Sequence, residues 1–171
     1  MLYPKYLHAF IDAPVWDSVR RTWRFIDFLL VDSYGHVDIV EIKKPFDNCI
    51  VSQTTYRDNH IPMRELTGTT MQMEKYIYHL GRSGRKNERK LSERYAAELP
   101  DGLHLKTVNP KGIIIMGRDS TLSGAQREDF EIIKRKYRNV IDILSYDDLL
   151  ARLKFTIAQL QYASEDQRAD G

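Results

Sequence analysis

Three charged residues, Asp27, Glu41 and Lys43, stand within or directly beside two apolar segments of the chain. Two carboxylates offer hard oxygen ligands that suit a divalent ion such as Mg²⁺, with water and phosphate completing its shell. Such an ion polarises a phosphodiester and lowers the pKa of a bound water. A lysine beside it can orient or deprotonate that water, or stabilise charge on the phosphorane. These residue types therefore suit metal-dependent phosphodiester hydrolysis, provided that the fold brings them together.

The segment that separates these residues predicts a β-hairpin. The run Ser33-Tyr34-Gly35 fits a three-residue hairpin loop, in which Gly35 supplies a positive φ. This loop pairs Asp32 with His36, and apolar residues on both sides of it are typical of strands inside a sheet.

Counting five residues back from Asp32 and five residues forward from His36 places Asp27 opposite Glu41. Side chains alternate faces along a strand, so Lys43 shares a face with Glu41 and Ile42 points to the other face. We therefore expect the three charged groups to converge at the end of the hairpin, where the strands separate. A charge among apolar strands is costly unless it is paired or holds a metal. The alternative interpretation is an ion pair between Glu41 and Lys43 at a solvated strand end.

A second candidate pair, Gln72 and Tyr76, lies in a segment whose apolar residues recur at helical spacing, from about residue 64 to 80. Residues four apart share one face of a helix. The Gln side chain can contact a metal-bound water or a phosphate, and the Tyr hydroxyl can contact a phosphate or orient a base. An ordinary amphipathic helix with one polar and one aromatic residue is the alternative.

Basic residues gather just after this helix, and they could neutralise phosphates along a DNA backbone. A solvated helix face is the alternative interpretation. The residues are Arg82, Arg85, Lys86, Arg89 and Lys90.

Composition limits the remaining possibilities. The chain has 171 residues, enough for one domain, and its net charge of +2 does not by itself indicate a nucleic-acid partner. A single cysteine excludes an internal disulfide framework and a cysteine-based zinc site. No apolar run approaches membrane-spanning length, and the first residues lack a signal-peptide pattern. We therefore expect a cytoplasmic protein with no membrane partner.

The elements that must position these residues alternate between strand and helix patterns, which predicts one α/β domain with a mixed sheet. We expect this domain to span residues 1–162, with a flexible tail at 163–171. The expected helices are 2–10, 64–80, 86–99, one from Asp119 or Ser123 to 138, and 146–162; the expected strands are 23–32, 36–43, 103–108, 113–116 and 140–144. Residues 47–62 show no clear period, and residues 57–60 are expected to form a loop.

Residues 25–44 and 72–76 resemble the PD-(D/E)xK nuclease superfamily, including the Q-x-x-x-Y helix of its RecB-like branch. A closer resemblance is to the nuclease domain of Shedu-type anti-phage defence proteins. Three pieces carry it: IDFLLVDSYGHVDIVEIKKP, then the Gln72 helix, then KGIIIMGR followed by a helix and VIDILSYDDLLARL.

This resemblance implies a restriction-endonuclease-like (PD-(D/E)xK) core over about residues 22–153, with a central mixed β-sheet flanked by α-helices. It implies a Mg²⁺-dependent DNA endonuclease, with Mn²⁺ as a substitute ion, that acts on phage or other foreign DNA as a homo-oligomer. In the site that it implies, Asp27, Glu41 and the backbone carbonyl of Ile42 hold the metal, Lys43 is the catalytic lysine, and Gln72 and Tyr76 complete the site.

One departure from the family pattern leaves alternatives open. Related nucleases often carry a further acidic residue on a helix before the first core strand, whereas only Asp12 and Asp17 are available here. Either one of them substitutes, or the chain is a fragment that lacks this helix. Other possible functions are a different nuclease of the same fold, in DNA repair or restriction, and a catalytically silent module for nucleic-acid binding or oligomerisation.

Overall fold

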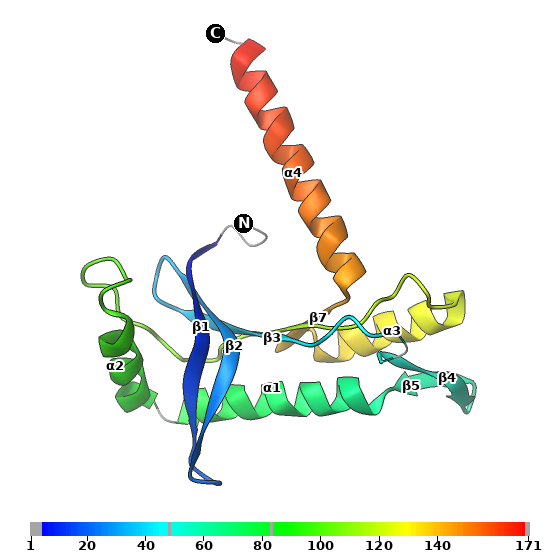
Figure 1. The fold of residues 1–171 in the computed structure, drawn as a ribbon, viewed down its shortest axis with the longest axis horizontal. Helices are drawn as coiled ribbons and strands as arrows, with labels where there is room; N and C mark the ends of the chain where they lie inside the picture. The colour runs from blue at the N-terminus through cyan, green and yellow to red at the C-terminus, as the bar shows by residue number, and fades with distance from the viewer. Residues whose placement is uncertain (1–4, 48, 83, 170–171) are drawn as a thin grey trace.

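A five-stranded mixed sheet forms the centre of the computed structural model, which describes residues 5–47, 49–82 and 84–169 (Figure 1). The strand order is β1-β2-β3-β6-β7; β1, β2 and β3 pair antiparallel, and β3, β6 and β7 pair parallel. The strands are β1 (Tyr6–Asp17), β2 (Thr22–Asp32), β3 (Val37–Ile42), β6 (Gly112–Ile115) and β7 (Ile141–Leu144).

Three helices cover one face of this sheet, and a fourth projects from the other side (Figure 1). The main core lies on the covered face, where Leu29 and Ile39 of the sheet are buried in one cluster with Met73 and Leu80. The expected mixed α/β fold with helices flanking a central sheet is confirmed. The helices are α1 (Arg64–Arg82), α2 (Gly84–Tyr95), α3 (Gly124–Tyr137) and α4 (Tyr146–Ala169).

The β2–β3 hairpin has the predicted register. The Asp32 amide donates to the His36 carbonyl at 3.0 Å, and Gly35 has a φ of 81°. The ladder runs from Val31–Val37 to Phe28–Val40, so it stops one step before the position where Asp27 would face Glu41. The two strands therefore separate where the candidate carboxylates lie, as we expected.

An irregularity in β1 and β2 lies at the same level. In β2 both Ile26 and Leu29 belong to the main core, although regular alternation would place residues three apart on opposite faces. In β1 Phe10 and Ala13 show the same spacing, and Asp12 between them has a φ of 51°. Irregularities of this kind bend strands and re-aim side chains near functional sites.

The predicted helix at residues 2–10 is wrong for the residues that the structure describes, because β1 begins at Tyr6; residues 2–4 lie outside the described part. β1 is an edge strand, so it alternates buried and partly exposed residues rather than forming an apolar run. Its Pro14 is tolerated at a sheet edge, where a missing N–H breaks no ladder.

Two other expectations need correction. Residues 47–62, which show no clear period in the sequence, contain the hairpin β4 (Val51–Tyr56) and β5 (Asn59–Pro62), so the loop expected at residues 57–60 is limited to the two turn residues 57 and 58. Its turn residues Arg57 and Asp58 both have positive φ, a tight-turn geometry that the sequence does not signal with glycine. The expected strand 103–108 reduces to one isolated bridge between His36 and Lys106.

The helix boundaries also differ. α2 runs from Gly84 to Tyr95 instead of 86–99, and α4 continues to Ala169, past the predicted end at 162. Residues 170–171 of the expected flexible tail lie outside the described part. Of the two caps considered for α3, Ser123 is correct, because its hydroxyl accepts from the Gln126 amide. None of the described helices combines the length and hydropathy that crossing a membrane would require.

Candidate active site

Glu41 is the centre of a polar cluster inside the sheet. Its side chain lies near the end of β3 and is only 2% exposed. One carboxylate oxygen, Oε1, accepts from Gln72 Nε2 at 2.8 Å and from Lys43 Nζ. The other, Oε2, is buried and has no hydrogen-bond partner among the described residues. Buried carboxylate oxygens are rarely left without a donor, so this atom calls for an explanation.

Asp27 lies beside Glu41 in the gap between the separated strands. Its Oδ2 accepts from the Ile42 amide at 2.6 Å, which replaces the ladder hydrogen bond lost at this level. Burial raises the pKa of Glu41, and the negative charge of Asp27 adds to the rise, while Lys43 and Gln72 oppose it. A divalent cation between the two carboxylates would remove this penalty, because it favours the ionised form of both.

Lys43 lies at the mouth of the cluster. Its ammonium group contacts Glu41 and lies 3.3 Å from Gln72 Oε1, and its backbone amide donates to the Ile115 carbonyl at 2.8 Å. The side chain is 36% exposed, whereas that of Glu41 is almost fully buried. The pair is therefore not the solvated strand-end ion pair of the alternative interpretation. The Ile42 side chain is 37% exposed and lies outside the cluster.

Gln72 and Tyr76 join the cluster from α1. Gln72 Nε2 also donates to the Tyr76 hydroxyl at 2.7 Å, and that hydroxyl donates to the Phe25 carbonyl at 3.1 Å. Burial raises the pKa of Tyr76. The expectation that Gln72 faces Glu41 and Lys43 is confirmed, so the structure brings together all five side chains proposed from the sequence: Asp27, Glu41, Lys43, Gln72 and Tyr76.

The two carboxylates considered as a substitute for the missing helix acid do not join the cluster. Asp12 is exposed. Asp17 is buried, but its oxygens accept from the Val19 and Arg20 amides and from Arg24 Nε. Within residues 5–47, 49–82 and 84–169, no group of three or more His, Cys, Asp or Glu side chains is placed to hold a metal. A metal held here would thus have two carboxylate ligands and take the rest from backbone, water or substrate.

A hollow of about 330 Å³ opens beside Lys43, and sequence reasoning missed two residues of α1 that line it, Glu65 and Thr69. Helical spacing could have found them, because residues 65, 69, 72 and 76 recur at steps of four and three on one face. This face of α1 therefore presents polar side chains along the hollow as well as at the cluster. The other lining residues are Lys44, Phe46, Cys49 and Met116.

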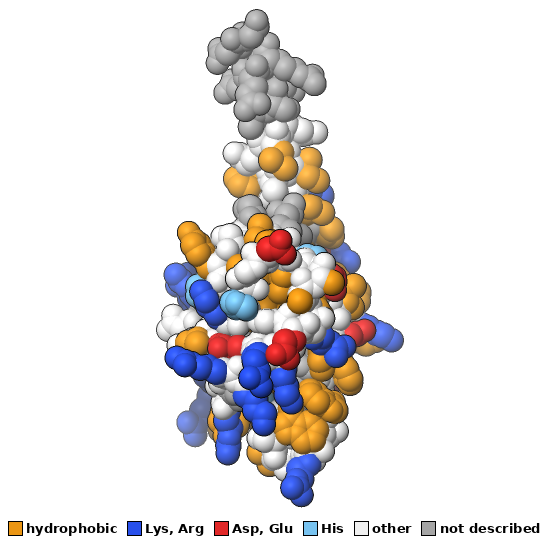
Figure 2. Space-filling model, turned by 90° about the vertical axis from the view of Figure 1, so that its left-hand side faces the viewer, with side chains coloured by type: hydrophobic (Ala, Val, Ile, Leu, Met, Phe, Trp, Pro, Cys, Tyr) orange, Lys and Arg blue, Asp and Glu red, His pale blue; other side chains and the backbone are white. Residues whose placement is uncertain are grey.

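The predicted basic cluster lies away from these carboxylates, at the end of α1 and along α2. All five side chains are exposed. Arg89 lies 3.6 Å from Glu93 in an exposed ion pair. Figure 2 shows basic side chains gathered across the side of the molecule on which α2 lies in Figure 1.

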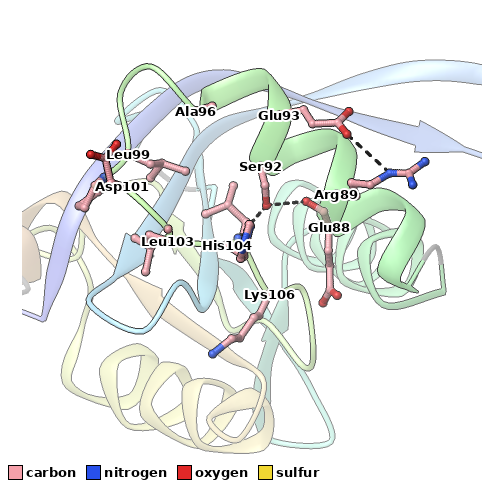
Figure 3. A pocket seen from close by; sticks show the side chains of 13 residues that line it. Glu88, Arg89, Ser92, Glu93, Ala96, Leu99, Asp101, Leu103, His104 and Lys106 are labelled. Carbon is pink, nitrogen blue, oxygen red and sulfur yellow. Dashed lines mark hydrogen bonds and ion pairs between the residues drawn. The ribbon is translucent and has the colours of Figure 1, made fainter.

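A hollow of about 530 Å³ lies between α2 and residues 99–106 and is not part of the cluster (Figure 3). Its polar groups bond to one another: the Ser92 hydroxyl donates to the Glu88 carbonyl and accepts from the Leu105 amide, each at 2.8 Å. Arg89 is the one predicted site residue in its lining. We regard this hollow as structural.

Comparison with known families identifies a match. The sequence model of a family described as "Shedu protein SduA, C-terminal" matches residues 3–150, which include the whole cluster. A search of curated proteins gives no match.

Proposed function

This chain belongs to the family of Shedu protein SduA C-terminal regions, and from that premise we propose that it is a metal-dependent DNA endonuclease domain. Within this proposal it is the effector domain of an anti-phage defence protein, and it has the restriction-endonuclease-like (PD-(D/E)xK) core that the sequence resembles. Family membership supports the defence role, and the polar cluster supports the chemistry. Family membership also makes a repair or restriction enzyme of the same fold the weaker alternative.

The observation that carries the proposal is the unpartnered Oε2 of Glu41. Leaving a buried carboxylate oxygen without a donor costs about 1–3 kcal/mol or more for a charged group. A fold that needed only an ion pair here could replace Glu41 and Lys43 together with apolar residues at little loss. The arrangement is understandable if Oε2 faces a cation that Asp27 and Glu41 hold together, with the Ile42 carbonyl as a further ligand. Mg²⁺ suits oxygen ligands, and we expect Mn²⁺ to substitute for it.

Each residue of the cluster then has a distinct role. A bound Mg²⁺ would polarise the scissile phosphate and lower the pKa of a bound water. Lys43, at the mouth of the cluster, orients that water or stabilises the charge that develops on the phosphate. Gln72 holds Lys43 and Glu41 in place through its two ends, and Tyr76 anchors Gln72 to the Phe25 carbonyl.

The experiment combines metal binding with plasmid cleavage. We expect Mn²⁺ or Mg²⁺ to bind in calorimetry and to support nicking of supercoiled DNA. We expect no nicking when Ca²⁺ replaces these ions or when EDTA removes them. Cleavage that continues undiminished in EDTA would refute the proposed metal dependence. Phage or other foreign DNA as the natural substrate, and a homo-oligomer as the active form, belong to the same proposal, and they are tested by phage challenge in cells and by light scattering.

One observation favours a second candidate, a catalytically silent DNA-binding or oligomerisation module. Only two carboxylates reach the cluster, and neither Asp12 nor Asp17 supplies a third. A silent module would bind DNA without cutting it at any concentration of Mg²⁺ or Mn²⁺. The plasmid assay therefore separates the two candidates directly.

A further inference from the structure

Two tryptophans and two lysines enclose a hollow of about 490 Å³ at the end of the β1–β2 hairpin, next to α2. None of these four residues belongs to the carboxylate cluster. The lining residues are Trp16, Trp23, Lys86, Asn87 and Lys90.

The tryptophans form a cross-strand pair that remains open to solvent. Trp16 pairs with Trp23 in the β1–β2 ladder, and their rings lie 5.2 Å apart at an interplanar angle of 63°. Trp16 is 37% exposed and Trp23 is 53% exposed. Phe25, two residues further along β2 and on the same face of the strand as Trp23, is also exposed. Large exposed aromatic surfaces that lie together usually mark a binding site.

The lysines bring positive charge to the same hollow. Lys86 and Lys90 are four residues apart on α2, so they project from one side of the helix. Both are exposed, and neither forms an ion pair with any residue that the structure describes, in contrast to Arg89 between them, which pairs with Glu93. Figure 2 shows the basic side chains of this side of the molecule next to a hydrophobic patch.

We propose that this hollow binds single-stranded DNA, with unpaired bases stacked on Trp16 and Trp23 and phosphates held by Lys86 and Lys90. Aromatic platforms flanked by basic groups suit single strands, because every unpaired base offers a π-face and every nucleotide a negative charge. In a duplex the base faces are covered by stacked neighbours, so the tryptophans favour an unpaired strand. That the ligand is DNA rests on the proposed function above.

The position of the hollow suits a strand that also reaches the carboxylates. Trp23 and Asp27 lie on the same strand, β2, four residues apart, which corresponds to about 13 Å at the usual rise per residue. This separation equals about four stacked nucleotides. The hollow would thus hold the substrate a few nucleotides from the bond that is cut, and it would direct cleavage towards partly unpaired DNA.

The chain offers a direct readout, because its only two tryptophans both line this hollow. We expect an oligothymidine of about 20 nucleotides, added in EDTA to prevent cleavage, to quench tryptophan fluorescence to saturation. A blunt duplex of the same length is expected to cause much less quenching. Equal quenching by the duplex, or no quenching by the single strand, would overturn the proposal.

Variants separate the two parts of the site. Trp23→Ala should weaken binding of the oligonucleotide about 5- to 150-fold, and Trp23→Phe, which keeps a ring and guards against misfolding, should restore most of it. Lys86→Ala/Lys90→Ala should reduce the slope of log affinity against log salt by about 1.4. The matched control, Arg135→Ala/Lys136→Ala, removes two exposed basic residues from α3, at the far end of the molecule (Figure 1). If the control weakens binding as much as the α2 variant, the hollow is not the binding site.

The outcome for this hollow is independent of the outcome for the nuclease. Quenching by single strands without any metal-dependent cutting would support the hollow and refute the proposed enzyme. Cutting without quenching would support the enzyme and refute the hollow.

Discussion

Two buried carboxylates, Asp17 and Glu41, both contact α1, and the fold treats them in opposite ways. Each is 2% exposed. Asp17 accepts from two backbone amides and from Arg24, and His79 of α1 lies 3.3 Å away. Its pKa is lowered to about 2, chiefly by the hydrogen bond from the Arg20 amide. Glu41 receives both of its hydrogen bonds on one oxygen, and burial raises its pKa.

The difference shows that this fold can satisfy a buried acid fully where the acid only holds the structure. Asp17 does so at the end of the β1–β2 hairpin, where it joins the turn to α1 through His79. Glu41 has one oxygen without a partner among the described residues, while Lys43 and Gln72 both bond to its other oxygen. We infer that Asp17 is a structural acid and that Glu41 is kept unsatisfied for a ligand.

The largest expected effect is the loss of nicking activity when Glu41 or its partner Lys43 is replaced. Lys43→Ala should reduce Mg²⁺-dependent nicking by about 10²- to 10⁴-fold, the range for losing a positioned acid–base group, while Mn²⁺ binding in calorimetry persists. Glu41→Ala should abolish nicking by abolishing the Mn²⁺ signal. Nicking of plasmid at matched protein concentration, followed on agarose gels, measures both.

The control for these two variants is a test of folding. Lys43→Ala removes one of the two donors to buried Glu41, so we expect it to lower the free energy of unfolding by about 1–3 kcal/mol. Circular dichroism must therefore show a folded variant at the assay temperature. If folded Lys43→Ala cuts as fast as the wild type, the assignment of Lys43 to the chemistry fails.

The next effect is a loss of folding stability when Asp17 is replaced. Asp17→Asn keeps the shape of the side chain but removes the charge that pairs with Arg24 and lies against His79, so the variant should be clearly less stable at pH 7. Because the folded-state pKa of Asp17 lies below its ordinary value of 3.8, its stabilising effect is present above that pH. It is lost as the pH falls towards about 2.

Urea unfolding between pH 2 and pH 7 measures this effect, and the two stability curves should converge at the acid end. Asp12→Asn is the matched control: Asp12 is exposed and has a positive φ that Asn tolerates, so we expect a change within about 0.5 kcal/mol. Equal losses in the two variants would remove the distinction between a satisfied acid and an ordinary surface acid.

The parts of the site that could be predicted are those that depend on local rules. The hairpin register follows from Gly35 and from strand alternation, and the position of Gln72 follows from helical spacing in a long, periodic segment. Both rules hold over a few residues, so distant parts of the chain do not change them.

What could not be predicted depends on contacts between distant segments. Asp17 and His79 are far apart in the sequence, so no spacing rule indicates that they meet. The tryptophan pair exists only because residues 6–17 form an edge strand, whereas the sequence suggested a helix over residues 2–10. The unpartnered oxygen of Glu41 is likewise a property of the packed site, since the pattern showed only that its charge would need a partner.

A smaller effect tests whether Glu41 is kept at a cost to stability. Glu41→Gln removes the buried charge while keeping the shape, so we expect the free energy of unfolding at pH 7 to rise by about 0.5–2 kcal/mol although nicking is lost. The folded-state pKa of Glu41 is raised, so the native state favours the protonated form. The wild type therefore loses stability as the pH rises through that pKa, and the gain of the variant should vanish in acid. A less stable variant at pH 7 would place Glu41 with Asp17 as a structural acid.

The smallest effect concerns Tyr76, which supports the cluster without contacting Glu41 directly. Tyr76→Phe deletes a hydroxyl that accepts from Gln72 and donates to the Phe25 carbonyl, so we expect a loss of stability of about 0.5–1.5 kcal/mol. Nicking should fall less than tenfold, because Gln72 still bonds to Glu41. Tyr78→Phe, on the same helix but 52% exposed, is the matched control and should change neither quantity measurably. If Tyr76→Phe instead slows nicking as much as Lys43→Ala does while remaining folded, Tyr76 acts in the chemistry. The working site would then extend one helical turn beyond Gln72, towards the buried Asp17–His79 pair.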